Sequence, residues 1–514
     1  MNIASFLHLS AARHPDRAAI VFGEQVTTYR DLQRRVAALA RGLTGLGVGP
    51  GDRVAVWMRN RPEMIETLFA TWRIGAVAVP VNPRATVEEV AYQVADSGAA
   101  ALVHGSDDPA VGGIEQTRLV DVRGRTGVAY QELLRQDPDD LGRAYPVHET
   151  DPAWLFYTSG TTGRPKGAIL THANLRFAVV SWCADLHQVQ PEDVVLHCAP
   201  LSHGAGFHAL VAVARGACNV ILERFSTGAV LETISRHRVT TTWLVPTQIR
   251  MLLDDPALDS ADLSSLTHVV YGGSPMYLAD IKEAVSRIGP VFCQLYGQGE
   301  SPMTITFLRR EDHVLAPETE EILTSAGVVR TGMEVRIADE DGREVPPGEV
   351  GEILVRGPAV MSGYWKREDA TREALRDGWL HTGDLGRQDK RGYVWVLDRL
   401  KDLIISGGAN VYAREVEDVI LSHPQVHEVA VVGVPHRLWG EMVVAAVVAT
   451  GDLDEAAVLG FCRARLADYK CPKQVRFVAE LPKNAYGKVL KRELRRLFQA
   501  EPESTPAMGR SASR

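Results

Sequence analysis

The stretch YTSGTTGRPKG, from Tyr157 to Gly167, gathers the groups that bind a polyphosphate. Backbone N–H groups beside glycines, small hydroxyl donors and one ammonium group suit phosphate oxygens. A P-loop of the GxxxxGK[ST] type is excluded, because Pro165 precedes the lysine and Gly167 follows it. A flexible surface turn is the remaining alternative, since Gly, Ser and Thr also mark ordinary loops. The candidate phosphate ligands are Thr158, Ser159, Gly160, Thr161, Thr162 and Lys166.

The composition limits the class of protein. The chain has 514 residues, which is too long for one hydrophobic core, so two or more domains are expected. Apolar residues make up 45% and charged residues 23%, which is typical of soluble globular proteins. The net charge of −8, with both signs interspersed, offers no basic face to nucleic acid or to a membrane surface.

The sequence gives no signal for export or membrane insertion. The N-terminal segment MNIASFLHLSAARHPDR has too short an apolar run and too many charges for a signal peptide. No run of 18 uncharged apolar residues is present, so no integral membrane segment is expected. The six cysteines lack CxxC spacing and are interpreted as reduced thiols. These features predict a cytoplasmic protein.

Strand and helix patterns alternate in the N-terminal part of the chain. The segment DRVAVWM (52–58) predicts a buried strand, RPEMIETLFATWRIG (61–75) a helix, and AVAVPV (76–81) another strand. This alternation predicts an α/β fold with largely parallel sheets. The glycines of GLGVGPGD (45–52) follow a helix and precede a strand. That order is the reverse of a dinucleotide-binding motif and indicates a helix cap and turn.

Three later β-rich segments end in Gly or Pro, namely VTTTWLVP (239–246), HVVYGGS (268–274) and GPVFCQLYG (289–297). Ligands of open α/β sheets bind beyond the carboxyl ends of strands, so we expect a site there. After residue 330, short strands alternate with turns and predict a small β-barrel or meander. We expect a large N-terminal domain over residues 1–400, a small α+β domain over 401–500 and a disordered tail over 501–514.

Six motifs occur in one order along the chain: YTSGTTGRPKG, APLSHGAG (199–206), QLYGQGES (294–301), WLHTGDLG (379–386), DRLKDLIISGGANVY (398–412) and LPKNAYGKVLKREL (481–494). This set resembles the adenylate-forming superfamily, which includes acyl-CoA synthetases, firefly luciferases and the adenylation domains of peptide synthetases. The resemblance covers all of the chain except the tail. It implies that a carboxylate attacks the α-phosphate of ATP, which gives an acyl-adenylate and pyrophosphate. A thiol then displaces AMP.

The resemblance also implies roles for individual residues. Thr158 to Lys166 bind the β- and γ-phosphates, Glu300 holds Mg²⁺, and Lys488 bridges the α-phosphate and the acyl carboxylate. Tyr296 stacks on adenine, and Asp384 and Arg399 contact the ribose. The remaining residues of the implied nucleotide site are Gly272, Gly273, Ser274, Gly297 and Gln298.

Two positions depart from the family pattern. The family has YGxTE where this chain has YGQGE, so Gly299 lacks a hydroxyl that would contact the AMP phosphate. Removal of one such donor costs roughly two to three orders of magnitude in rate at an oxyanion site. Tyr486 replaces a small hydroxyl residue before Gly487 and Lys488. Because the lysine is retained, we expect these departures to affect the rate rather than the reaction.

Coenzyme A is the expected acyl acceptor. By resemblance, the pantetheine route involves Ser406, Gly407, Gly408 and Trp439. Lys470 and Lys473 either contact the phosphates of CoA or face solvent. No carrier-protein GxDS serine motif follows, which favours a stand-alone acyl-CoA synthetase over a peptide-synthetase module. A ligase that loads a carrier protein, or passes the adenylate to a partner enzyme, is the alternative.

The resemblance further implies that the C-terminal domain rotates about Lys401 between the two half-reactions. A non-enzymatic ATP sensor is disfavoured, because Glu300 and Lys488 are both retained. A homodimer is compatible with the sequence.

The acid substrate is expected to be apolar. His203 matches the aromatic gate of the family's acyl tunnel, and the candidate pocket walls are Trp243, Val245, Tyr271 and Met303. A zinc site of His197, His203 and His208 is disfavoured, because their spacing fits no helical ligand pair. No basic or acidic residue is placed for a second carboxylate or an amine. We therefore expect an apolar monocarboxylic acid, whether fatty, cyclic or a secondary metabolite.

Overall fold

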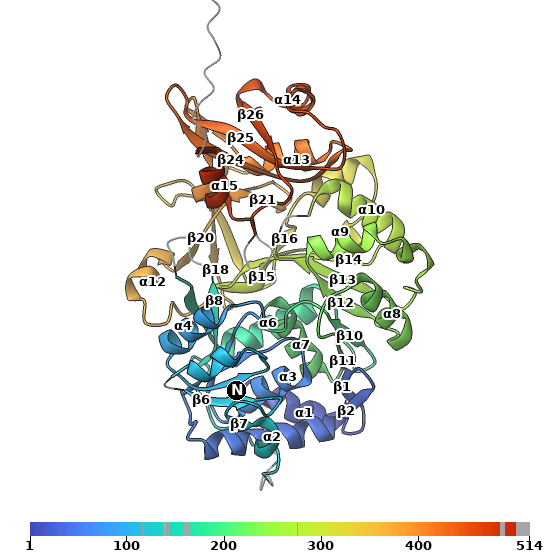
Figure 1. The fold of residues 1–514 in the computed structure, drawn as a ribbon, viewed down its shortest axis with the longest axis vertical. Helices are drawn as coiled ribbons and strands as arrows, with labels where there is room; N and C mark the ends of the chain where they lie inside the picture. The colour runs from blue at the N-terminus through green and yellow to red at the C-terminus, as the bar shows by residue number, and fades with distance from the viewer. Residues whose placement is uncertain are drawn as a thin grey trace, which may run out of the picture. The chain divides into compact units, whose positions relative to one another are not determined.

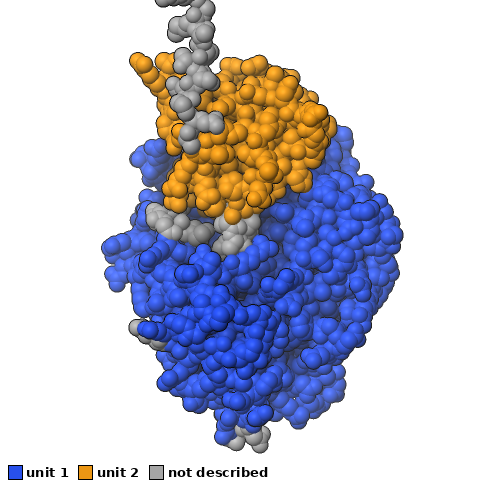
Figure 2. Space-filling model, in the orientation of Figure 1, with its two compact units in different colours: residues 1–382, 386–396 blue, residues 383–385, 397–514 orange. Residues whose placement is uncertain are grey.

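The computed structural model describes residues 1–115, 117–136, 141, 143–158, 164–274, 276–483 and 489–499. The chain forms two compact units (Figure 2). The first unit contains residues 1–382 and 386–396, and the second unit contains residues 383–385 and 397–514. This mixed α/β architecture, with a large N-terminal part and a smaller C-terminal part, confirms the predicted fold class. Within the part of the chain that is described, no helix combines the length and apolar composition needed to cross a membrane.

A nine-stranded sheet forms one half of the first unit, in the order β16-β15-β14-β13-β12-β10-β11-β1-β2 (Figure 1). Its central strands from β1 to β14 are parallel, and β2, β15 and β16 pair antiparallel at the edges. The strands are β1 (Ala18–Phe22), β2 (Gln25–Thr28), β10 (Val194–His197), β11 (Cys218–Ile221), β12 (Thr241–Leu244), β13 (His268–Gly272), β14 (Phe292–Gln298), β15 (Ser301–Leu308) and β16 (Val328–Val329).

A seven-stranded sheet forms the other half, in the order β7-β6-β5-β3-β4-β8-β9. It is parallel except for the antiparallel hairpin of its last two strands. The strands are β3 (Arg53–Trp57), β4 (Val77–Pro80), β5 (Ala99–His104), β6 (Arg118–Asp121), β7 (Val128–Ala129), β8 (Pro152–Thr158) and β9 (Lys166–Thr171). The predicted strands at 52–58 and 76–81 are therefore present as β3 and β4.

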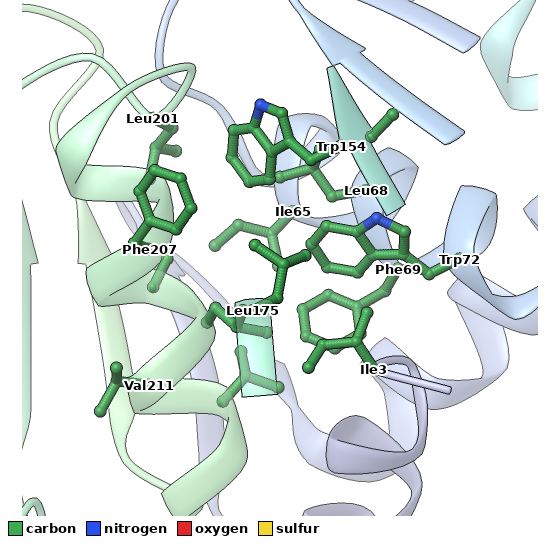
Figure 3. Packing of buried hydrophobic residues seen from close by; sticks show 14 of the residues in the cluster. Ile3, Ile65, Leu68, Phe69, Trp72, Trp154, Leu175, Leu201, Phe207 and Val211 are labelled. Atoms are coloured by element: carbon green, nitrogen blue, oxygen red, sulfur yellow. The ribbon is translucent and has the colours of Figure 1, made fainter. Parts of the chain in front are cut away.

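The main hydrophobic core contains residues of both sheets and of the helices that pack on them (Figure 3). Helix α3 (Pro62–Arg73) contributes Ile65, Leu68, Phe69 and Trp72, and it begins at a proline whose fixed φ suits a first helical turn. Trp154 of β8 stacks on Phe207 with 4.8 Å between ring centroids. The other helices of the first unit are α1 (Ser5–Arg13), α2 (Tyr29–Gly45), α4 (Val87–Ser97), α5 (Tyr130–Leu133), α6 (His172–Asp185), α7 (Gly204–Arg215), α8 (Thr227–His237), α9 (Pro246–Asp254), α10 (Leu278–Ile288), α11 (Glu320–Leu323) and α12 (Glu368–Ala374).

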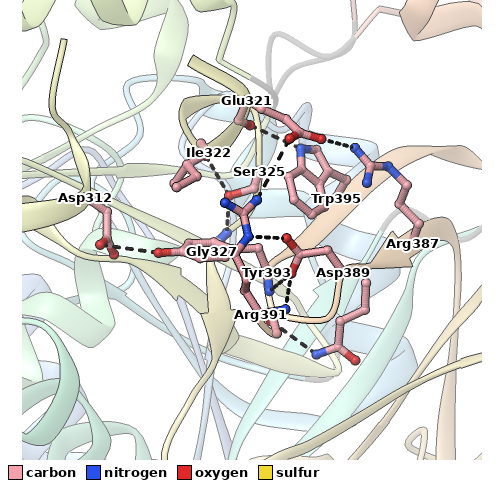
Figure 4. Close-up of polar contacts among 12 residues, drawn as sticks. Asp312, Glu321, Ile322, Ser325, Gly327, Arg387, Asp389, Arg391, Tyr393 and Trp395 are labelled. Atoms are coloured by element: carbon pink, nitrogen blue, oxygen red, sulfur yellow. Dashed lines mark hydrogen bonds and ion pairs between the residues drawn. The ribbon is translucent and has the colours of Figure 1, made fainter. Parts of the chain in front are cut away.

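The predicted barrel or meander after residue 330 is a five-stranded sheet, in which β17 pairs antiparallel with β18 and β19 antiparallel with β20. Its order is β17-β18-β20-β19, and β21 pairs with β20. The strands are β17 (Glu334–Ala338), β18 (Val350–Arg356), β19 (Leu375–Arg376), β20 (Trp379–Gln388) and β21 (Val394–Arg399). The turn after β20 is closed by Asp389, which accepts from the backbone N–H groups of Arg391 (2.9 Å) and Tyr393 (3.0 Å) (Figure 4). Arg387 pairs with Glu321 at 3.0 Å, which fastens this hairpin to α11.

The second unit contains a sheet with the order β23-β22-β25-β24, and β26 pairs with β25. Valine and alanine side chains alternate along its two long strands and fill a hydrophobic cluster on each face. The strands are β22 (Ile404–Ser406), β23 (Ala409–Val411), β24 (Val426–His436), β25 (Gly440–Ala449) and β26 (Gln474–Phe477). The helices are α13 (Ala413–Leu421), α14 (Glu455–Arg463) and α15 (Lys491–Gln499).

Candidate active site

The candidate phosphate-binding stretch connects β8 to β9. Thr158 ends β8 and lies opposite Lys166, the first residue of β9, in the antiparallel register. The hydroxyl of Tyr92 in α4 donates to the carbonyl of Pro165 at 2.9 Å, and the Arg164 guanidinium lies over the Tyr92 ring. The two ends of the stretch are thus held by regular structure. Ser159, Gly160, Thr161 and Thr162 lie outside the described residues.

Glu300 lies in the turn between β14 and β15 and is 9% exposed. Thr158 Oγ1 donates to Glu300 Oε1 at 3.1 Å, and the Tyr364 hydroxyl donates to the same oxygen at 2.6 Å. Lys166 Nζ lies 4.5 Å from the centroid of the Tyr364 ring. The structure therefore brings together Thr158, Lys166 and Glu300, three of the predicted residues, around a tyrosine that the sequence analysis missed.

Tyr364 has a protonation state that fits this arrangement. Burial and the neighbouring Glu300 carboxylate raise the pKa of its hydroxyl, so it stays a donor at neutral pH. Its ring provides the π face on which the Lys166 ammonium rests. In the sequence, Tyr364 is one aromatic residue in a loop after β18, and no local pattern connects it to Glu300.

Gly299 occupies a place that has no room for a side chain. A Cβ atom there would lie 2.2 Å from Thr158 Cγ2 and 2.7 Å from Phe156 Cδ1. Gly299 stands where the family has threonine, and in this chain the side chain of Thr158 fills the space that a larger residue at position 299 would need.

The residues predicted to contact adenosine follow two neighbouring parallel strands. Gly272 at the end of β13 pairs with Leu295 of β14, directly before Tyr296. A Cβ at Gly272 would lie 2.5 Å from the Leu295 carbonyl oxygen, and Gly273 has φ +86°. Glycine is needed at both positions for these reasons. Gly297, Gln298 and Ser274 lie in the same two segments, beyond or at the carboxyl ends of β13 and β14.

His203 precedes helix α7 and borders a group of aromatic rings. Its Nδ1 shares a hydrogen bond of 2.8 Å with Ser202 Oγ, and its ring meets Phe156 edge-on at 5.5 Å. Burial lowers the pKa of His203 to about 4, so the ring is neutral at physiological pH. A Cβ at Gly204 would lie 2.7 Å from Trp243 Cζ2, which shows that the indole packs against the start of α7.

The predicted pocket walls do not all share one face of the nine-stranded sheet. Trp243 and Met303 belong to the main core, and Val245 Cγ1 lies 3.9 Å from the Cβ position of Gly273. Tyr271 belongs to the cluster on the opposite face, where its hydroxyl lies 2.9 Å from His313 Nε2. Trp243 and Tyr271, both predicted as pocket walls, therefore point to opposite faces of the sheet, because side chains alternate along a strand.

In the second unit, Arg399 Nε lies 2.6 Å from Asp384 Oδ1, and Asp384 is 3% exposed. The two residues predicted to contact ribose are thus paired with each other. Lys401 lies in the 3₁₀ helix Leu400–Asp402, and burial lowers the pKa of its ammonium group. Lys488 and Tyr486 lie outside the described residues.

The residues predicted to bind CoA meet at a tight hairpin of the second unit. Ser406 pairs with Ala409 across Gly407 (φ +60°) and Gly408 (φ +80°). The Gly407 N–H donates to the carbonyl of Trp439 at 2.8 Å. Lys470 is paired with Glu415 at 2.6 Å and Lys473 with Asp468 at 3.4 Å.

The three histidines considered for zinc do not form one group. His203 is bonded to Ser202, whereas His197 and His208 meet edge-on at 5.6 Å between ring centroids. Across the described ranges, no three His, Cys, Asp or Glu side chains come together as metal ligands.

Comparison with known proteins gives matches over nearly the whole chain. Residues 7–365 match the model of the AMP-binding enzymes, and residues 415–488 match that of the AMP-binding enzyme C-terminal domain. A feruloyl-CoA synthase of Amycolatopsis sp is 43% identical over 95% of this chain and 97% of that protein.

Two solved structures are similar throughout. The amide bond synthetase McbA from Marinactinospora thermotolerans has a TM-score of 0.87 at 34% identity, covering 96% of this chain and 100% of that one. The o-succinylbenzoate CoA synthetase (MenE) from Bacillus subtilis, in complex with ATP and magnesium ion, has a TM-score of 0.85 at 33% identity. That comparison covers 95% of this chain and 99% of the MenE chain.

Proposed function

The chain belongs to the AMP-binding enzyme family and is an AMP-forming acyl-CoA synthetase, and on this premise we propose that it activates an aryl carboxylic acid. Membership of this family implies ATP and CoA as co-substrates. The acid reacts through an acyl-adenylate, and CoA then takes the acyl group.

The proposal of an aryl acid rests on the group of aromatic rings beside His203. Phe156 meets His203 edge-on, Phe207 stacks near Phe156 at 6.0 Å, and Trp243 packs on Gly204. Offset and edge-on contacts with such rings favour a planar aromatic substrate over a flexible chain. Feruloyl-CoA synthase and o-succinylbenzoate CoA synthetase, both similar to this chain, are named for acids with an aromatic ring.

For the phosphates of ATP we propose Thr158, Lys166 and the intervening Ser159, Gly160, Thr161 and Thr162. Lys166 brings a positive charge to the polyphosphate, which lowers the repulsion that an anionic nucleophile meets. Glu300 fits a Mg²⁺ site, because its buried carboxylate offers oxygen ligands and the two hydrogen bonds that Thr158 and Tyr364 donate to it both fall on Oε1. When bound, the ion would reduce the negative charge of the phosphates. Lys488 is proposed as the residue that bridges the reacting anions.

For adenosine we propose stacking by Tyr296 beside Gly272, Gly273, Ser274, Gly297 and Gln298. Gln298 Nε2 already donates to the Thr382 carbonyl at 3.0 Å, which fixes its orientation. In the second unit, Asp384 is proposed to accept from the ribose hydroxyls, with Arg399 holding the carboxylate in place.

We propose that CoA binds at the hairpin of Ser406, Gly407 and Gly408, beside Trp439. We propose Lys401 as the hinge residue. Two positive-φ glycines permit close backbone approach of a narrow ligand such as pantetheine. Lys470 and Lys473 each form an ion pair with a carboxylate, which favours a structural role for these lysines over contact with the phosphates of CoA.

The acid class is tested by a substrate panel. The purified full chain is given ATP, Mg²⁺, CoA and either aryl acids (cinnamic, 4-hydroxycinnamic, ferulic, benzoic) or medium- and long-chain fatty acids. Pyrophosphate release gives kcat/KM for each acid. We expect an aryl acid to have the highest kcat/KM, and a fatty acid in that position would contradict the proposal.

A further inference from the structure

A layer of buried polar side chains lies behind Trp243, away from the residues assigned to ATP. Trp182 of α6 stacks on Trp243 with 6.1 Å between ring centroids. His208 of α7 stacks on Trp182 at 4.5 Å. His197 of β10 meets His208 edge-on at 5.6 Å. Trp182, His197 and His208 are each 0% exposed. The layer is therefore continuous, through Trp243, with the start of α7 at Gly204.

Polar atoms of this layer lack hydrogen-bond partners among the described residues. These atoms are both ring nitrogens of His208, Nδ1 of His197, Nε1 of Trp182 and Oγ1 of Thr241. Thr241 lies on β12 two residues before Trp243, on the same face of the sheet. Buried polar groups are rarely left unpaired, because the loss of hydration is then not compensated. Several such atoms in one layer indicate a hydrogen-bond partner beyond the described residues.

The hydrogen-bonding character of these atoms follows from their surroundings. Asn219 Nδ2 donates to the carbonyl of Ala19, so its Oδ1 accepts from His197 Nε2 at 2.9 Å. His197 Nδ1 is therefore an acceptor, whereas Trp182 Nε1 is a donor. Burial keeps His208 neutral by lowering its pKa, which leaves it one donor and one acceptor. The layer thus matches a group that both donates and accepts, and no ionic group is needed.

We propose that His208, with Trp182 and His197, forms the polar end of the acid pocket and recognises a hydroxyl group on the aromatic ring of the substrate. The inference rests on the proposed aryl-acid function. A phenolic hydroxyl both donates and accepts, which matches the donor and acceptor atoms of this layer. Internal water that binds the same atoms without contacting substrate is the competing explanation.

The test compares 4-hydroxycinnamic acid with cinnamic acid, from which it differs only by the phenolic hydroxyl. His208→Phe removes both ring nitrogens and keeps the ring that stacks on Trp182. We expect the ratio of kcat/KM for 4-hydroxycinnamic over cinnamic acid to fall about tenfold or more, as loss of a buried hydrogen bond predicts. His208→Gln keeps a donor and an acceptor and should retain most of the preference.

His104→Phe is the matched control. His104 of β5 is 1% exposed and, like His208, has no ring-nitrogen hydrogen bond within the described part of the chain. It lies in the seven-stranded sheet. His104→Phe should leave the ratio of kcat/KM for the two acids unchanged. An equal loss for both acids in His208→Phe, or an unchanged ratio, would overturn the inference and favour internal water. A wild-type enzyme that activates no aryl acid would contradict the proposed function itself.

Discussion

At the scale of single residues, Tyr364 connects the two charged groups of the candidate phosphate site. Tyr364→Phe removes the hydrogen bond to Glu300 and keeps the ring under Lys166. Because hydrogen bonds to charged groups are the stronger kind, we expect kcat to fall about ten- to a hundredfold. The Mg²⁺ concentration for half-maximal rate should rise as well. Tyr364→Leu, which also removes the π face, should additionally raise KM for ATP. An unchanged Mg²⁺ titration in both variants would show that Tyr364 only supports the fold.

Gly299 provides a second test at this scale. Gly299→Ala places a methyl group 2.2 Å from Thr158 Cγ2, so Thr158 must move from Glu300. Overpacking of this kind typically costs about 1–3 kcal/mol in the free energy of unfolding, and we expect KM for ATP to rise with it. Gly228→Ala in α8, where nothing lies within 4 Å, is the control and should be neutral or stabilising by up to about 1 kcal/mol. Chemical denaturation and initial rates measure both; a fully active and stable Gly299→Ala would contradict the crowding at this position.

The residues found from the sequence are those with a local signature. Thr158, Lys166 and Glu300 lie in dense motifs, and the structure brings them together. Tyr364 is distant in sequence and without a pattern of its own. The face of Tyr271 depends on the register between β12 and β13, in which Trp243 lies opposite Val270, and a single sequence does not reveal that register.

At the scale of elements, the hairpin between β22 and β23 depends on two left-handed glycines. Gly408→Ala forces an alanine to φ near +80°, which costs roughly 1–2 kcal/mol and is expected to distort the turn beside Trp439. We expect thioester formation from a supplied acyl-adenylate to slow, while ATP–pyrophosphate exchange persists. Gly342→Ala, at φ +77° in a turn of the first unit, imposes the same strain elsewhere and is the control. Equal loss of both half-reactions in Gly408→Ala would argue against a role in CoA binding.

The alternation of strands and helices could be predicted because burial sets the pattern of apolar residues. β3, β4, β12 and β13 lie within segments predicted as strands, and β14 extends one residue beyond its predicted segment. The sheet that follows residue 330 was predicted only as a barrel or meander, since short strands separated by turns do not define their pairing order.

At the scale of the whole molecule, two half-reactions are proposed to use different arrangements of the two units. Lys401 lies in the first turn of a 3₁₀ helix, where a proline fits without loss of a helical hydrogen bond. Lys401→Pro should therefore fold but restrict the dihedral change that rotation requires. We expect pyrophosphate exchange to persist and CoA-dependent product formation to collapse, with Lys401→Ala retaining both. If the two activities fall together, or neither falls, Lys401 is not the hinge.

The product balance of the complete reaction distinguishes an AMP-forming acyl-CoA synthetase from other ATP-dependent ligases. The full chain is incubated with ATP, Mg²⁺, ferulic acid and CoA, and AMP, pyrophosphate and the acyl thioester are quantified by mass spectrometry. We expect equal amounts of the three products, with sustained formation only when acid and CoA are both present. ADP in place of AMP, or an acyl product formed with an amine but not with CoA, would contradict it.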